Sequence, residues 1–237
     1  MNSDKKTAII VGVLFIACTV TSILSGLFIG PLDAPDYLVN VAANENQVLK
    51  GMLVQSIWAL TCVGIPVMLF PILKKHNEAL ALGFFSLRLI EGVFVFLAIV
   101  CQLSILTLSK EFVTGVLDAS YYQASGTLLL AARDWGGHVV LDVAVFPLGA
   151  LIFNYLLYQS KLIPRWLSIW GLIGAPLALA EGLLSMFGLF DSFSTNAILL
   201  SLPIAVNEMV LAVWLIVKGF NSSAIASGSA KTDINKV

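Results

Sequence analysis

Charged side chains are scarce in this chain. Only 11% of its 237 residues are Asp, Glu, Lys or Arg, and 59% are hydrophobic, whereas a soluble domain usually carries about 25% charge. We therefore expect lipid to be the main solvent of the folded chain. The formal net charge is only −1, so the chain as a whole is not expected to attract a nucleic acid or an acidic lipid.

Histidine and cysteine are also rare. The chain has two histidines, His76 and His138, and three cysteines, Cys18, Cys62 and Cys101. No CxxC motif or Cys/His metal spacing occurs, and two histidines are too few for the histidine-rich zinc sites of intramembrane hydrolases. Because all three cysteines fall in apolar runs, we expect reduced packing residues rather than a disulfide framework. We expect no cofactor and no bound metal, and an enzyme is the least favoured class.

Long apolar runs are what the sequence has instead. A helix that crosses a bilayer needs about 20 predominantly apolar residues. Six runs meet this requirement: residues 7–29, 51–72, 79–106, 138–158, 166–190 and 198–217. They predict an all-α polytopic membrane protein, a bundle of six transmembrane helices forming one domain over residues 1–220. The small, polar residues 221–237 are expected to be a disordered tail.

The positions of Lys and Arg predict the orientation of the bundle. Seven basic residues lie near one set of span ends: Lys5, Lys6, Lys74, Lys75, Lys161, Arg165 and Lys218. The alternate loops hold fewer bases, so both termini are predicted to be cytoplasmic. The first apolar run is too long for a signal-peptide core and is interpreted as a retained helix. In the long loop 110–137 we expect a helix that lies on the outer surface or re-enters the membrane.

Three stretches carry a resemblance to a known family: RLIEG (88–92), YLLYQSKLIPRWLSIWGLIGA (155–175) and LPIAVNEMVLAVWLIVKGF (202–220). They resemble bacterial multi-span membrane proteins catalogued only as a domain of unknown function (four-three-eight-six). The most specific parts are YQSKLIPRW and NEMVLAVWLIVKGF. The resemblance covers nearly the whole chain and implies a six-helix bundle in a bacterial inner membrane. It implies no reaction, but Arg88, Glu91 and Glu208 match polar positions of the family.

Several polar residues fall deep inside the predicted spans. At about 1.5 Å per residue, Arg88 lies about 13 Å from the inner edge of a core about 30 Å thick, and Glu91 about 18 Å. Glu208 lies about 15 Å in, and other polar residues continue towards the outer edge. Together they predict an outward-facing polar cavity with seven candidate lining residues: Arg88, Glu91, His138, Asp142, Glu181, Asn207 and Glu208.

The charges of these residues do not balance. One arginine faces four carboxyl groups, and desolvation forbids about three uncompensated negative charges without water, a cation or protonation. Arg88 stays charged and needs a carboxylate partner. Glu91 shares its helix face at i+3, and Glu208 lies at a similar depth, so both remain candidates. The alternative interpretation is a buried ion pair that only fixes helix register.

Three classes of function remain. The favoured class is binding or transport of a small solute or cation through the polar cavity. The alternative is a non-catalytic membrane module that binds a protein or a lipid. A hydrolase that uses Asp142 and His138 is less favoured, because no nucleophile is placed beside them. The expected partners are membrane lipids, a small solute or cation, and a second copy of the chain, because six short helices are few for a transporter acting alone.

Overall fold

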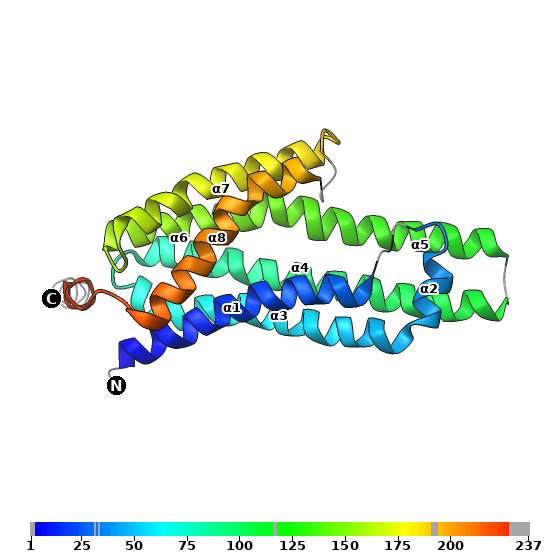
Figure 1. Cartoon of the computed structure of the whole chain (residues 1–237), viewed down its shortest axis with the longest axis horizontal. Helices are drawn as coiled ribbons and strands as arrows, with labels where there is room; N and C mark the ends of the chain where they lie inside the picture. The colour runs from blue at the N-terminus through cyan, green and yellow to red at the C-terminus, as the bar shows by residue number, and fades with distance from the viewer. Residues whose placement is uncertain (1–2, 31, 33, 116–117, 191–193, 228–237) are drawn as a thin grey trace.

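The chain folds into a bundle of long helices. The computed structural model describes residues 3–30, 32, 34–115, 118–190 and 194–227. Over these residues the elements are α1 (Ser3–Ile29), α2 (Tyr37–Ala43), α3 (Glu45–Leu73), α4 (Glu78–Thr114), α5 (Ala119–Asp134), the π-helix η1 (Trp135–Val145), α6 (Phe146–Ser160), α7 (Arg165–Met186) and α8 (Thr195–Val217), with no strand (Figure 1). The predicted all-α fold is confirmed.

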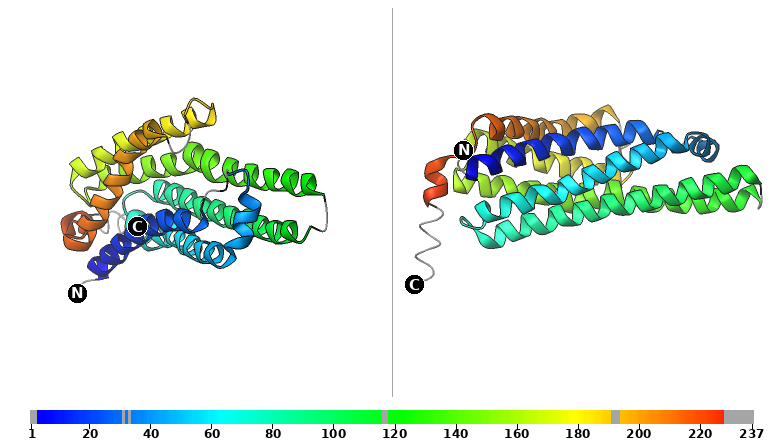
Figure 2. Two further views of the ribbon diagram at one scale, coloured as in Figure 1. Left: turned by 45° about the vertical axis from the view of Figure 1, so that its right-hand side comes forward. Right: turned by 90° about the horizontal axis from the view of Figure 1, so that it is seen from below.

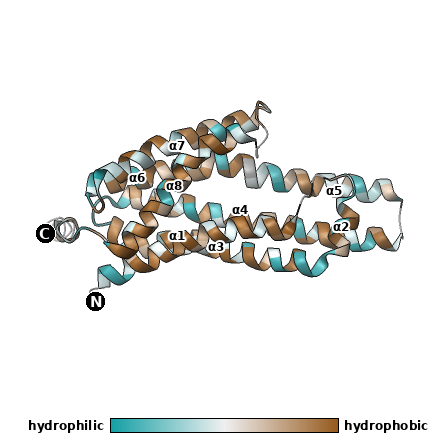
Figure 3. Cartoon of the chain, viewed as in Figure 1, coloured by the Kyte–Doolittle hydropathy of each residue, from teal (hydrophilic) through white to brown (hydrophobic). Residues whose placement is uncertain are grey.

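The six predicted spans are also confirmed. α1, α3, α4, the continuous run from α5 through η1 to α6, α7 and α8 are each long and apolar enough to cross a membrane. Figure 3 shows mostly apolar residues along these helices, with hydrophilic residues near many of their ends and a few in the middle of the bundle. Large apolar side chains such as Leu53, Leu60 and Ile173 are exposed on the outside of the bundle, as expected where lipid replaces water.

Most helices extend beyond the apolar runs that predict them. α4 continues to Thr114 because no glycine or proline interrupts it after Gly92. It ends at Gly115, whose φ of 68° is the left-handed conformation that favours glycine at a helix end. The chain then returns as α5, which packs against α4. The loop 110–137 therefore contains a helix, as expected, and that helix packs alongside α4; residues 116–117 lie outside the described part of the structure.

The two ends of the bundle differ in shape. The start of α1 and the end of α8 lie at the same end, which we call the terminal end (Figure 1). At the far end, α4 and α5 run side by side past the ends of α7 and α8, with α2 packed against α4 (Figures 1 and 2). The 37 residues of α4 correspond to about 55 Å, so about 25 Å of helix projects beyond a hydrocarbon core about 30 Å thick.

The projecting part has a small core of its own. Tyr37, Met52, Ile105 and Tyr122 are buried together in it. Gly126 allows this packing, because a Cβ there would overlap the Tyr37 hydroxyl. Burial also raises the pKa of Tyr37. At the start of α5, the backbone N–H and the hydroxyl of Ser120 donate to the Asp118 carboxylate, which lowers its pKa.

The main core joins all the long helices at the terminal half of the bundle. α1 packs against both α3 and α8, and α7 packs against α6 and α8. Phe84 of α4 stacks on Phe153 of α6, with ring centroids 4.5 Å apart. Phe15 of α1 lies next to the same Phe153 ring. This aromatic layer holds the helices that carry the central polar residues.

The π-helix η1 interrupts the long span between α5 and α6. It ends where the Phe146 N–H bonds to the carbonyl of Leu141, five residues back. Pro147 follows directly, and its ring would clash with the carbonyl four residues before it in a regular helix. The wider π-helical turn avoids that clash, and such turns often occur at functional sites. Asp142 lies in this segment.

The C-terminal segment is partly helical. Residues 222–227 form a short helix within the stretch where disorder is expected from composition. Asn221 begins it, and its side chain accepts from the backbone N–H and hydroxyl of Ser223, the kind of local bond that starts a helix. Residues 228–237 lie outside the described part of the structure.

Candidate functional site

An ion pair lies at the centre of the bundle. The Arg88 Nη1 atom is 2.9 Å from Glu91 Oε2 and 3.1 Å from Glu91 Oε1. Both residues lie on α4 three positions apart, so they share one helix face. Arg88 is only 5% exposed and Glu91 6%. A buried pair of this kind requires further polar contacts around it to offset the cost of desolvation.

Two cysteines supply such contacts. Cys18 of α1 and Cys62 of α3 have their Sγ atoms 3.7 Å apart. Cys62 Sγ lies 3.4 Å from Glu91 Oε1, and Arg88 Nη2 lies 3.8 Å from Cys18 Sγ. These four residues form one cluster, which we call the ion-pair cluster. The sequence places both thiols in apolar runs but does not indicate that they meet each other and the ion pair, because that depends on how α1, α3 and α4 are packed.

A small cavity adjoins the ion pair. Its volume is about 10 Å³, about the space that one water molecule needs. Four polar residues line it together with aromatic and aliphatic side chains: Arg88, Asn154, Asn207 and Glu208. We call this space the core cavity.

Two polar atoms of residues around the core cavity lack hydrogen-bond partners in the described structure. Arg88 Nε and Asn154 Oδ1 are buried and make no hydrogen bond within the described structure. Asn207, in contrast, donates from Nδ2 to the carbonyl of Leu167 at 2.9 Å and so links α8 to α7. Buried polar atoms normally find partners. The unsatisfied donor and acceptor therefore indicate room for a small polar occupant.

A second polar position lies between η1 and α7. Asp142 comes so close to α7 that a Cβ added to Gly182 would meet the Asp142 carbonyl oxygen at 2.5 Å. The neighbouring residue Glu181 is 7% exposed and accepts a hydrogen bond of 2.8 Å from Ser185. Asp142 and Glu181 are thus near enough for their charges to influence each other, and neither forms an ion pair with another described side chain.

The seven residues that the sequence predicts to line one cavity do not all lie together in the structure. Arg88, Asn207 and Glu208 line the core cavity, while Glu91 lies behind Arg88 in the ion-pair cluster. Asp142 and Glu181 form the second position. The His138 side chain lies outside the described part of the structure. Asn154, Cys18 and Cys62 are additional residues that sequence reasoning did not assign to the site.

Glu208 is close to Arg88 without being its ion-pair partner. Both line the core cavity, and the two charges interact. Of the ion pairs between described residues, however, the one that contains Arg88 is with Glu91. The ion-pair partner of Arg88 is thus Glu91, and Glu208 is half-buried and forms no ion pair within the described residues.

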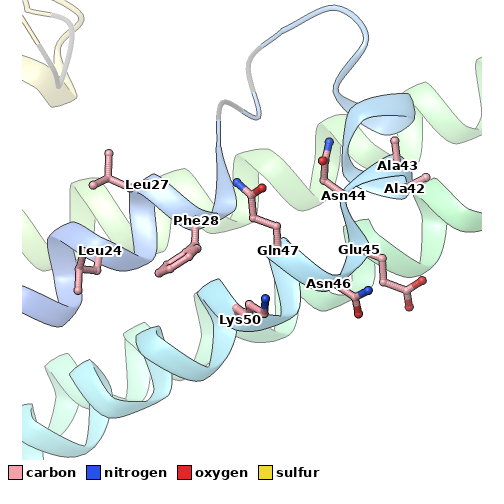
Figure 4. A pocket seen from close by; sticks show the side chains of 10 residues that line it. All are labelled: Leu24, Leu27, Phe28, Ala42, Ala43, Asn44, Glu45, Asn46, Gln47 and Lys50. Atoms are coloured by element: carbon pink, nitrogen blue, oxygen red, sulfur yellow. The ribbon is translucent and has the colours of Figure 1, made fainter.

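Larger hollows lie at the two ends of the bundle. Figure 4 shows one of about 790 Å³ at the far end, between the last turns of α1 and the junction of α2 and α3. Its walls carry Glu45 and Lys50, which are accessible at the surface, and it does not include the core carboxyl groups. No group of three or more His, Cys, Asp or Glu side chains is placed to hold a metal ion within the described ranges.

Comparison with known proteins identifies the family. Neither a curated protein nor a solved structure matches the chain. A family model described as a domain of unknown function, DUF4386, matches residues 10–219, a range that runs from the first turns of α1 to just past α8 and includes the ion-pair cluster and the core cavity. The chain therefore belongs to the DUF4386 family of domains of unknown function.

Proposed function

We propose that this membrane protein binds a small cation or a small polar solute at the core cavity, and that a core carboxyl group exchanges a proton as the ligand enters or leaves. We further propose a bacterial inner membrane as its location, with both termini in the cytoplasm. The concentration of Lys and Arg at the terminal end supports this orientation. The solute would pass between the far end and the terminal end through the core cavity, so that the protein transports it across the membrane.

The imbalance of charge around Arg88 carries the proposal. Glu91 neutralises Arg88, and among the residues whose side chains the structure describes, Asp142, Glu181 and Glu208 form no ion pair. Three bare carboxylates inside a membrane are too costly to persist. Protons, a metal cation or water must compensate them, and each of these is exchangeable. Buried carboxyl groups with this property are typical of ion and proton pathways.

The surroundings of the core cavity are consistent with a small occupant. Its volume accommodates one water molecule or one small cation, so any larger solute would require the helices to separate. α8 has a site for such movement, because Pro203 removes one backbone hydrogen bond five residues before Glu208. Towards the far end, Gln55 of α3 and Gln102 of α4 present buried, unsatisfied side-chain oxygens that extend the polar path.

Proton release on ligand binding tests this proposal. The purified full chain is titrated in weak buffer with Na⁺, K⁺, ammonium salts and small zwitterionic solutes while released protons are measured with a pH-sensitive dye. We expect one of these ligands to release protons from the wild type, and the release to be lost in Glu208→Gln. Glu45→Gln is the matched control, because that carboxylate is exposed and paired with Lys110.

The non-catalytic module is the second candidate, and one observation favours it. The core cavity is small. In the ion-pair cluster, the Sγ atoms of Cys62 and Cys18 contact Glu91 and Arg88 respectively. Such packing is also what a purely structural ion pair would have. If no ligand released protons from the wild type, and Glu208→Gln behaved like Glu45→Gln, the module would replace the binding protein as the better account.

A further inference from the structure

A basic pocket lies at the terminal end of the bundle, separate from the core cavity. It has a volume of about 550 Å³ and forms where the turn between α6 and α7 meets the end of α8. Three basic residues line it: Lys161, Arg165 and Lys218. Trp214 forms part of the wall, and the described lining residues include no Asp or Glu.

Two stretches far apart in the sequence build this pocket. After α8, Gly219 adopts a φ of 73° and turns the chain back towards the α6–α7 turn. The Asn221 N–H then donates to the Leu162 carbonyl at 2.9 Å, and the Asn221 side chain donates to the Lys161 carbonyl. The YQSKLIPRW stretch and the end of α8 therefore meet here. These are the two stretches in which the resemblance to the family is most specific.

The three basic residues have no acidic ion-pair partner in the described part of the chain. The Arg165 guanidinium rests on the Tyr158 ring, 5.0 Å from its centroid, which orients it without neutralising it. Lys161 holds the left-handed conformation, with φ 57°, and so places a charged side chain in a tight turn. The pocket therefore concentrates positive charge in a hollow that can admit an anion.

We propose that this pocket binds the phosphate-bearing headgroup of an anionic phospholipid. Basic pockets between transmembrane helices are suited to such headgroups. Trp166 and Trp214, whose rings pack edge to face, mark the level of the membrane interface. Immediately towards the bundle centre, the α8 side chains Val213 and Val217 are exposed and offer an apolar surface to acyl chains. A soluble phosphate would use the basic residues but not this surface.

The net charge of the whole chain does not describe the charge at this pocket. A formal charge of −1 for the whole chain argues against an acidic lipid as partner, but it averages over both ends of the bundle. Lipid headgroups respond to charge within about a Debye length, roughly 8–10 Å. The local charge of the pocket therefore decides binding. A simpler account is that the three basic residues only set the orientation of the chain during membrane insertion. The experiment below distinguishes this account from lipid binding.

Lipid titration of the purified full chain tests the proposal. The chain in neutral detergent is titrated with short-chain phosphatidylglycerol, with the matching phosphatidylcholine and with inorganic phosphate, and bound lipid is counted by native mass spectrometry. We expect saturable binding of one phosphatidylglycerol, with at least tenfold weaker binding of phosphatidylcholine. At about 1 kcal/mol per basic residue, removal of all three charges should weaken binding by about a hundredfold.

The variants are chosen to keep the backbone intact. Lys161→Asn removes the charge and keeps a residue that tolerates the left-handed conformation, and it is combined with Arg165→Gln and Lys218→Gln. The control is Lys74→Gln with Lys75→Gln, which removes two charges at the same end but outside the pocket. If the triple variant does not fold, Lys161→Asn alone should weaken binding by about fivefold.

Three results would overturn the proposal. The first is phosphatidylglycerol binding that is equal in the wild type and in the triple variant. The second is equal loss in the control variant, which would indicate a diffuse effect of charge. The third is displacement of the lipid by inorganic phosphate at matched concentration, which would indicate a soluble anion as the natural occupant. Because the core cavity takes no part in any of these measurements, their outcome is independent of the function proposed above.

Discussion

Glu91 Oε2 lies 2.9 Å from Arg88 Nη1, and this ion pair organises the centre of the bundle. Its two partners belong to the same helix, so the pair does not by itself connect helices. The connection comes from Cys18 of α1 and Cys62 of α3, which contact the arginine and the glutamate respectively. Glu208 of α8 is therefore not needed to neutralise Arg88. For this reason we propose that Glu208 is the carboxyl group that exchanges a proton for the ligand.

The first prediction concerns the energetics of the pair. Arg88→Met and Glu91→Gln should each destabilise the protein by about 3–5 kcal/mol, because each leaves one buried charge without compensation. The double variant should recover part of that loss, since no orphan charge remains. Chemical denaturation in detergent provides the measurement. Glu208→Gln combined with Arg88→Met serves as the control and should show weaker coupling. Strong coupling to Glu208 with additive losses for Glu91 would reverse the assignment.

The second prediction concerns the two thiols. The Sγ atoms of Cys18 and Cys62 are 3.7 Å apart, so these two thiols are in contact and are the pair expected to close to the S–S distance of about 2.05 Å in a disulfide. A lipid-soluble two-electron oxidant such as a quinone should therefore close them, taking up two electrons and two protons and forming the hydroquinone. Mass spectrometry of the digested protein should show the Cys18–Cys62 cross-link. Mixed cross-links that involve Cys101 in similar yield would contradict this arrangement.

The third prediction concerns close approach at the second polar position. Gly182→Ala should destabilise the protein by about 1–3 kcal/mol, because the new methyl group would collide with the backbone of Asp142. Gly26→Ala is the matched control: no atom lies within 4 Å of its added Cβ, and alanine favours a helix over glycine by about 1 kcal/mol. It should be neutral or stabilising. Thermal unfolding in detergent compares the two, and equal losses would show that η1 and α7 are less closely packed.

The fourth prediction concerns orientation. In intact cells, Gln123→Cys on α5 should react with an impermeant maleimide, because α5 projects at the far end. Gln159→Cys near the end of α6 should react only after the membrane is permeabilised, since it lies at the terminal end. Both residues are exposed, so burial does not bias the comparison. The native cysteines are buried and should contribute little signal. Labelling of Gln159→Cys alone in intact cells would invert the orientation.

Composition and periodicity were sufficient to predict the helical fold. Six apolar runs and the lack of charge lead to six spans, because a membrane permits few alternatives to a helix. Helix ends were harder to predict, because a helix continues in water until a residue such as Gly115 stops it. For that reason the sequence did not predict the projecting α4–α5 pair. Residues 107–114 are polar enough to leave the membrane but contain no glycine or proline that would end the helix.

The site could be predicted only in part. Arg88 with Glu91 follows from i, i+3 spacing on one helix, and depth counting placed Glu208 at a similar level. Depth does not determine which side of a helix faces which neighbour. For this reason depth counting joined Asp142 and Glu181 to the same predicted cavity, whereas the structure places them at a separate position between η1 and α7. Likewise, the contact between Cys18 and Cys62 depends on how α1 packs against α3. Apolar periodicity in a single sequence does not predict that packing.

Cation-coupled proton flux in proteoliposomes is the most direct test of the central claim, that Glu208 beside Arg88 exchanges a proton for a ligand. Vesicles that contain the full chain and an entrapped pH-sensitive dye are exposed to the ligand that releases protons in solution. The wild type should move protons when the ligand is added, Glu208→Gln should not, and Glu45→Gln should match the wild type. Equal flux in wild type and Glu208→Gln, or none in either, would contradict the account.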